Sequence, residues 1–262
     1  MAESSMRFTD GEAYERFMGR WSRAVGALFL DWVAPPVNAD WLDVGCGTGA
    51  FTELLLDACA PHSVIAVDPS PEQIVHARSL PVAAKADFRV ADAQALPFPD
   101  RSFDVVASAL VINFIPDRPR GLSEMRRVAR PGGVVAGYVW DFAGRRTPNT
   151  ILGLTARRMG VEVMQAPGTA DSTLERLAAL FGEAGFTGVE SRAFEVTCDY
   201  VNFDDYWDAQ TPSFNPLTHA LNALSERDRA AVKEKTRAAV PARSDGSISV
   251  SATANAVKGR VS

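Results

Sequence analysis

The stretch 41-WLDVGCGTG-49 joins a short apolar run to a turn that contains three glycines. Such a turn lets the backbone lie directly against a ligand, because glycine adopts conformations that other residues avoid. Gly45, Gly47 and Ala50 fit the G-x-G-x-x-A pattern of dinucleotide-binding turns. Gly45, Gly47 and Gly49 fit a G-x-G-x-G pattern equally well. The glycines alone therefore leave two ligand classes open.

The charge next to the turn distinguishes these classes. Asp43 stands two residues before the first glycine. A pyrophosphate is attracted to the backbone N–H groups at a helix N-terminus, and a neighbouring carboxylate would repel it. S-adenosylmethionine has no phosphate but carries an ammonium and a sulfonium group, both of which a carboxylate favours. Asp43 therefore favours S-adenosylmethionine over NAD.

The chain around the turn alternates strand-like and helix-like segments, which is typical of a parallel sheet with crossover helices. One helix start is marked by Ser70, with Pro71 at the first position and Gln73 completing a capping box. Ser172 and Glu175 predict a second capping box. The apolar runs predict seven strands, at residues 40–45, 63–68, 87–92, 103–111, 133–140, 188–200 and 247–257.

The bulk composition is that of a soluble globular protein, with 23% charged and 47% hydrophobic residues in 262. The net charge of −5 does not favour a nucleic-acid partner, which requires a basic face. The three cysteines have no metal-ligand spacing, so we expect no metal site. We find no signal peptide and no apolar run long enough for a membrane span, and we expect a cytoplasmic protein.

We expect one domain over residues 1–262, because no additional segment is large enough to bury a core of its own. Residues 36–141 form its predicted cofactor-binding core. An aromatic and basic helix pattern at 1–35 predicts a lid, and 142–171 predicts an insertion. Residues 172–262 complete the sheet and include a helical insertion at about 202–246.

Four segments resemble class I S-adenosylmethionine-dependent methyltransferases of the ubiquinone and menaquinone biosynthesis type. They are, in the order of that family, "LDVGCGTG", "VIAVDPSPEQIVHAR", "VADAQALPFPDRSFDVV" and "EMRRVARPGGVV". The resemblance covers about the central 100 residues. It implies an α/β, Rossmann-like fold with a seven-stranded, mostly parallel sheet, helices on both faces and the last strand antiparallel. The seven strands that the apolar runs predict agree with this fold.

The resemblance also implies roles for residues at the ends of the predicted strands. Asp43, Gly45, Gly47 and Gly49 would lie at the methionine end of the donor. Asp68, followed by Pro69, would accept hydrogen bonds from the two ribose hydroxyls. The adenine amino group would lie at Asp92 and Ala93, and the donor would touch Ser108 and Ala109. Plain loop, turn or packing roles are the alternatives at Asp68, Asp92, Ser108 and Ala109.

The predicted reaction transfers a methyl group to a small or medium-sized, partly apolar molecule and leaves S-adenosylhomocysteine. The segment after the fourth strand, "SALVINFIPD", lacks the Asn/Asp-Pro-Pro-Tyr-like tetrapeptide of amino methylation at adenine, cytosine or glutamine. Asp141 and His219 are the candidate general bases, with structural roles as the alternative. The acceptor itself and the oligomeric state do not follow from these patterns.

Two aromatic segments add further candidates. Tyr14 and Arg20 would close over the donor, with the arginine meeting its carboxylate. Helix packing is the alternative for this segment. The cluster Phe203, Tyr206, Trp207 and Phe214 fits an apolar acceptor pocket or the core of the insertion. A non-catalytic module that binds the donor, and less favoured an NAD-dependent oxidoreductase, remain as alternative functions.

Overall fold

The computed structural model describes residues 19–213 and 215–262. Seven strands form one sheet in the order β3-β2-β1-β4-β5-β7-β6. All neighbours pair in parallel except β7, which runs antiparallel to both β5 and β6. The predicted fold, with its last strand antiparallel, is confirmed. The strands are β1 Asp40–Val44, β2 Ser63–Asp68, β3 Asp87–Val90, β4 Phe103–Ala109, β5 Ala129–Trp140, β6 Thr187–Tyr200 and β7 Ile248–Arg260.

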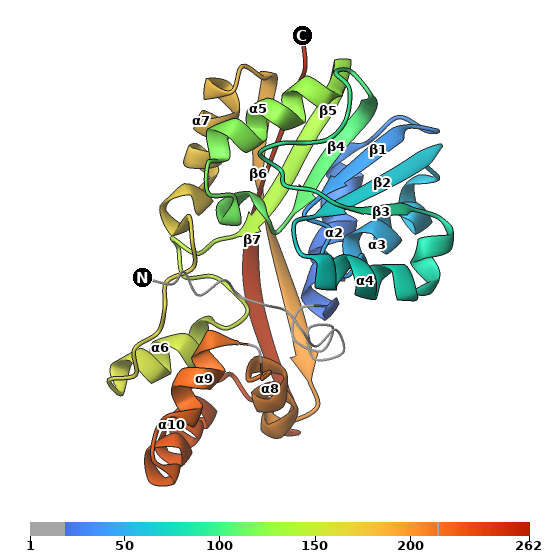
Figure 1. Cartoon of the computed structure of the whole chain (residues 1–262). Helices are drawn as coiled ribbons and strands as arrows, with labels where there is room; N and C mark the ends of the chain where they lie inside the picture. The colour runs from blue at the N-terminus through green and yellow to red at the C-terminus, as the bar shows by residue number, and fades with distance from the viewer. Residues whose placement is uncertain (1–18, 214) are drawn as a thin grey trace.

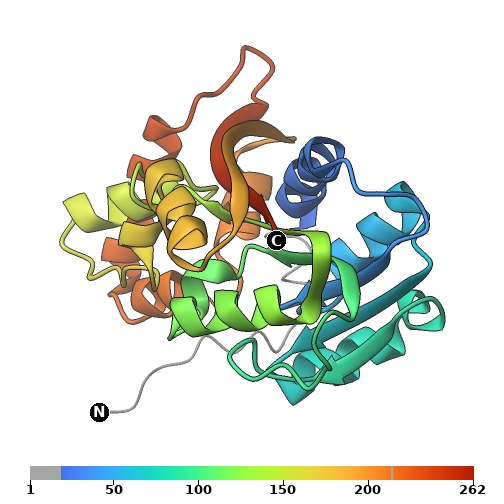
Figure 2. The same cartoon turned by 90° about the horizontal axis from the view of Figure 1, so that it is seen from above.

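Helices cover both faces of the sheet (Figure 1). One face carries α2, α3 and α4, and the other carries α5 and α7; Figure 2 shows α2 and α5 on opposite sides of the strands. The remaining helices, α6, α8, α9 and α10, lie beyond the carboxyl ends of the parallel strands, in the lower half of Figure 1. The helices are α2 Arg20–Val33, α3 Ala50–Cys59, α4 Pro71–Ser79, α5 Arg118–Val128, α6 Thr150–Arg158, α7 Leu174–Glu183, α8 Phe203–Gln210, α9 Pro216–Asn222 and α10 Glu226–Ala239, with short 3-10 turns η2 Pro81–Ala84, η3 Ile112–Phe114 and η4 Thr169–Ser172.

The alternation of side chains along β1 divides the core into two layers. Trp41 packs with α2 and α3, whereas Leu42 packs with α5 and α7. In the first layer the ring centroids of Phe29 and Tyr138 are 4.8 Å apart. The described part of the predicted N-terminal lid is α2, and it packs along this face of the sheet with Phe29 fully buried. Residues 1–18, which include Tyr14, lie outside the described residues.

The two predicted helix starts have different outcomes. Ser70 is the N-cap of α4, and its hydroxyl accepts from the Gln73 N–H at 3.3 Å. The second prediction is wrong by one residue, because Thr173 is the N-cap of α7 and accepts from the Arg176 N–H. The Ser172 hydroxyl instead donates to the Thr169 carbonyl oxygen at 2.7 Å, inside η4.

The turn between β1 and α3 depends on backbone that only glycine adopts at low cost. Gly45 and Gly47 have φ of +81° and +55°. A Cβ atom added to Gly45 would collide with the side chain of Val111, whereas one added to Gly47 would enter open space. The first glycine is therefore required for packing as well as for backbone conformation, and the second for backbone conformation alone.

We predict that Gly45→Ala lowers the free energy of unfolding more than Gly47→Ala does. Both variants carry the left-handed backbone cost of roughly 1–2 kcal/mol. Gly45→Ala adds overpacking, typically about 1–3 kcal/mol. Urea unfolding measures the difference, and Val111→Ala should restore part of the loss in a double variant with Gly45→Ala. Equal losses for the two alanine variants would contradict this packing.

Candidate functional site

The glycine turn lies at the carboxyl ends of β1 and β2. The N–H groups of Gly45 and Cys46 both donate to the carbonyl oxygen of Val67, at 2.7 and 2.9 Å. Gly49, with φ of +90°, is the residue that precedes α3, and its N–H donates to the Cys46 carbonyl at 2.8 Å. The turn is thus fixed to the end of β2, and its open side is at Gly47. This is where a ligand can approach the backbone.

Asp68, at the end of β2, holds the turn and the next helix together. One carboxylate oxygen accepts from the Gly47 N–H at 3.0 Å and the other from the Ser70 N–H at 2.9 Å. Burial raises the pKa of this half-buried carboxyl, and the two backbone bonds oppose that effect. A carboxylate has about four acceptor positions. Asp68 therefore retains capacity for two further donors, such as a pair of vicinal hydroxyls.

Asp43 is fully buried beneath the turn. One of its oxygens accepts from the Thr52 hydroxyl at 2.6 Å, and the other has no hydrogen-bond partner in the part of the chain that the structure describes. Burial, with a smaller contribution from the charge of Asp68, raises the pKa of Asp43 to about 7. Two carboxyl groups below one glycine turn make this end of the sheet favourable for a cation.

The other predicted donor residues follow β3 and β4 at the same edge. The Ala91 N–H donates to the Asp68 carbonyl at 3.1 Å, which brings Asp92 and Ala93 next to the end of β2. Asp92 is exposed, and its carboxylate accepts from Gln94. Ala93 is buried. The structure thus brings Asp92 and Ala93 to the edge that holds the glycine turn and Asp68.

The end of β4 contacts the glycine turn directly. Ser108 is fully buried, and its hydroxyl has no partner among the residues that the structure describes; Ala109 is partly exposed. Leu110 adopts a φ of +63°, which costs free energy in a bulky residue and is characteristic of functional sites. Val111 packs against Gly45. The segment after β4 is therefore part of the same site.

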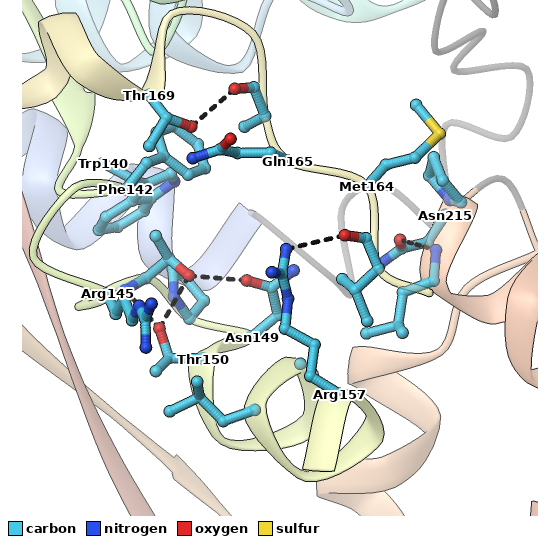
Figure 3. A pocket seen from close by; sticks show the side chains of 18 of the residues that line it. Trp140, Phe142, Arg145, Asn149, Thr150, Arg157, Met164, Gln165, Thr169 and Asn215 are labelled. Carbon is cyan, nitrogen blue, oxygen red and sulfur yellow. Dashed lines mark hydrogen bonds between the residues drawn. The ribbon is translucent and has the colours of Figure 1, made fainter. Parts of the chain in front are cut away.

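A pocket of about 280 Å³ lies beside this segment (Figure 3). Its wall contains Leu110 and Phe114 from the end of β4 and η3, and Trp140 and Phe142 from the end of β5. The opposite wall is formed by α6, residues 163–166, Thr169 and the start of α9. Sequence patterns did not indicate this pocket, because its residues come from separate segments without a common motif. The positive φ of Leu110, visible only in the structure, is the local signal for it.

The two candidate bases do not line this pocket. Asp141 is buried and binds the Arg146 guanidinium, with its other oxygen accepting from the Gly144 N–H at 2.8 Å. His219 is exposed on α9, and its Nε2 is hydrogen-bonded to the Ser213 carbonyl. Both side chains are thus engaged in contacts within the protein, away from the described lining of the pocket.

Arg20 and the aromatic cluster also occupy places apart from the glycine turn. The Arg20 guanidinium lies at the end of β6, where it donates to the Asp199 carbonyl at 3.3 Å and faces the Tyr200 ring. The side chains of Phe203, Tyr206 and Trp207 are buried in the core, so the alternative of an insertion core applies to these three. Phe214 lies outside the described residues.

The central region of the chain is similar to known methyltransferases. Residues 42–137 match the model of a methyltransferase domain. The 2-methyl-6-phytyl-1,4-hydroquinone methyltransferase of Synechocystis sp. is 38% identical over 107 residues, which are 40% of this chain and 33% of that protein. The malonyl-[acyl-carrier protein] O-methyltransferase of Serratia marcescens is 34% identical over 149 residues, 52% of this chain and 57% of that protein. The chain thus spans about a third to just over half of the length of these relatives.

The whole fold has solved counterparts. The YcgJ protein of Bacillus subtilis superposes with a TM-score of 0.59 at 18% identity, over 92% of this chain and 98% of that one. The superposition confirms the fold, and the domain match confirms the resemblance to methyltransferases that the motifs predict. The domain match supports S-adenosylmethionine as the cofactor. Within residues 19–213 and 215–262, no helix has the length and hydropathy that crossing a membrane requires.

We predict a pH dependence of stability that originates at Asp43. Its pKa of about 7 in the folded state lies above the value of 3.8 expected in the unfolded chain, so folding takes up a proton between these values. Stability from this group is therefore present at pH 4 and is lost as the pH rises through 7, by an order of a few kcal/mol. Asp43→Asn, which cannot ionise, should lack this decline. Urea unfolding from pH 4 to 8 measures it.

The control for this measurement is Asp57→Asn, at an exposed position of α3, the helix that follows the turn. This variant should keep the pH profile of the unchanged protein. A profile for Asp43→Asn that parallels the unchanged protein would contradict the assignment.

Proposed function

We propose that the chain transfers a methyl group from S-adenosylmethionine to a small, partly apolar molecule. The observation that carries the proposal is the continuity between the glycine turn and the pocket. Val111 packs on Gly45 of the turn, and the preceding residue, Leu110, lines the pocket. A donor on the turn and an acceptor in the pocket would therefore meet at one dipeptide.

The donor site follows from the groups at the strand ends. The open side of Gly47 would receive the methionine part, with the carboxyl group of Asp43 beneath it. The unused acceptor positions of Asp68 would bind the ribose hydroxyls, with Pro69 adjoining. Asp92 and Ala93 would border the adenine, and Ser108 and Ala109 the sulfonium side. Arg20 lies at the end of β6 and already contacts Asp199 and Tyr200. The donor site is therefore proposed without Arg20.

Methyl transfer requires alignment of the donor and the acceptor more than it requires a general base. The reaction breaks the bond between the sulfur and the methyl carbon and forms one to the acceptor nucleophile, whose electron pair attacks in line with the leaving sulfur. Among the described residues that line the pocket there is no acid, histidine, lysine, cysteine or tyrosine. Proximity and exclusion of water are then the main contributions of the protein. An acceptor whose nucleophile is already deprotonated or carries a lone pair fits such a pocket.

The names of the relatives support a methyltransferase without choosing its acceptor. One is named for a hydroquinone and another for a malonyl group on an acyl-carrier protein. These acceptors differ in chemistry, and the matched domain model spans residues 42–137, where the proposed donor site lies. The acceptor class has to be inferred from the pocket of this chain.

Binding of S-adenosylhomocysteine, measured by calorimetry, tests the donor site. We expect binding to the unchanged protein and none of NAD. Asp68→Asn should weaken binding on the order of 100-fold, because it removes charge from the acceptor of two hydrogen bonds. Asp87→Asn, at an exposed position of β3, is the control, since its ion pair with Arg89 is on the surface.

Three outcomes would contradict the proposal. Binding of NAD without S-adenosylhomocysteine would assign the turn to a dinucleotide. Equal affinity in Asp68→Asn and the unchanged protein would remove the ribose assignment. Donor binding with no S-adenosylhomocysteine produced across a broad acceptor panel would favour a non-catalytic module instead.

A further inference from the structure

The pocket beside the glycine turn combines apolar walls with two positively charged side chains. Trp140, Phe142 and Leu154 supply apolar walls, and Arg145 and Arg157 lie among the lining residues (Figure 3). No aspartate or glutamate of the described chain lines it. A site with this composition attracts a molecule that is both apolar and anionic.

Neither arginine has a carboxylate partner in the described part of the chain. Arg157 donates through Nη2 to the Val163 carbonyl at 2.7 Å, which orients the guanidinium and leaves its charge uncompensated. No side-chain hydrogen bond or ion pair involves Arg145 among the described residues, and only its backbone N–H is bonded, to the Phe142 carbonyl. The adjacent Arg146 is different, because Asp141 neutralises it at 2.7 Å. Of these two adjacent arginines, Arg145 therefore brings an uncompensated positive charge to the pocket, whereas Arg146 does not.

The backbone at Arg145 is held in place by the buried Asp141. Arg145 has a φ of +54°, a conformation that persists in a non-glycine residue only when the surroundings impose it. Asp141 accepts from the Gly144 N–H on one side and pairs with Arg146 on the other, so it clamps both neighbours of Arg145. Asp141 thus acts as a positioning residue for this turn.

The pocket also offers exposed apolar side chains. Phe114 and Met164, which line it, are 38% and 58% exposed. Large apolar side chains in contact with water at a pocket are covered when an apolar ligand binds. The occupant therefore has an apolar body that extends along Phe114 and Met164 as well as a charged group.

We propose that the acceptor is an amphipathic carboxylic acid, whose carboxylate binds Arg145 and Arg157 and whose apolar body packs on Trp140 and Phe142. Each guanidinium group presents a donor fork that suits a carboxylate. The identification as acceptor rests on the proposed function, whereas the preference for an acid is a property of the pocket itself.

Calorimetry with ω-phenylalkanoic acids of graded chain length and their matched neutral amides tests the inference, with and without S-adenosylhomocysteine. At least one acid should bind about tenfold or more tightly than its amide. Arg145→Gln and Arg157→Gln should each weaken acid binding about tenfold and leave amide binding unchanged. Arg158→Gln, at an exposed neighbour outside the pocket, is the control and should change neither.

The outcomes separate the two proposals. If no acid binds below 1 mM, a limit on the order of −4 kcal/mol, the inference fails. It also fails if amides bind as tightly as acids, or if both arginine variants keep the affinity for the acid. Acid binding without S-adenosylhomocysteine binding would leave the pocket assignment standing and overturn the methyltransferase proposal. Binding of S-adenosylhomocysteine with no preference for acids would overturn the pocket assignment and leave the methyltransferase proposal standing.

Discussion

The turn after β1 is the constraint on which the rest of the structure depends. The backbone passes from a buried strand into α3 through left-handed conformations, and two of its N–H groups are bound to the end of β2. This arrangement encloses the carboxyl group of Asp43, and of the three glycines in the turn Gly47 alone has open space where a side chain would stand. Val111 fills the space next to Gly45, so the same turn sets the position of the segment after β4 and, through Leu110, one wall of the pocket.

Sequence patterns predict the sheet well because its central strands are buried on both faces and read as short apolar runs. All seven strands lie where these runs are, although β5 begins earlier, at Ala129, and takes in the Pro-Gly-Gly segment at a shift of register with β4. The error at Ser172 has a local cause. Either of two adjacent residues with hydroxyl side chains can cap a helix. Thr173 is the cap here, because the Ser172 hydroxyl donates to the Thr169 carbonyl oxygen within η4.

The positions of the proposed donor residues are predictable for a related reason. They stand directly at the ends of parallel strands, so a correct sheet places them along one edge, as it does for Asp68 and Asp92. The pocket could not be predicted, because it is assembled from the ends of two strands, from α6 and the start of α9, and from the turns and loops between these elements. The aromatic residues of α8 fit either an acceptor pocket or a core, and in the structure they are buried in the core. The roles of Tyr14 and Arg20 toward the donor stay predictions, with Arg20 engaged elsewhere.

Because the insertions lie outside the sheet, substitutions in the two parts affect the protein differently. The donor half depends on strand ends and a glycine turn, where a substitution disturbs folding. The far wall of the pocket belongs to α6, the start of α9 and the loops around them, outside the sheet, while Phe203, Tyr206 and Trp207 join the neighbouring α8 to the core that α2 forms with the sheet. With the proposed function, selectivity for the acceptor can therefore diverge, in evolution or by engineering, while the proposed donor half stays intact.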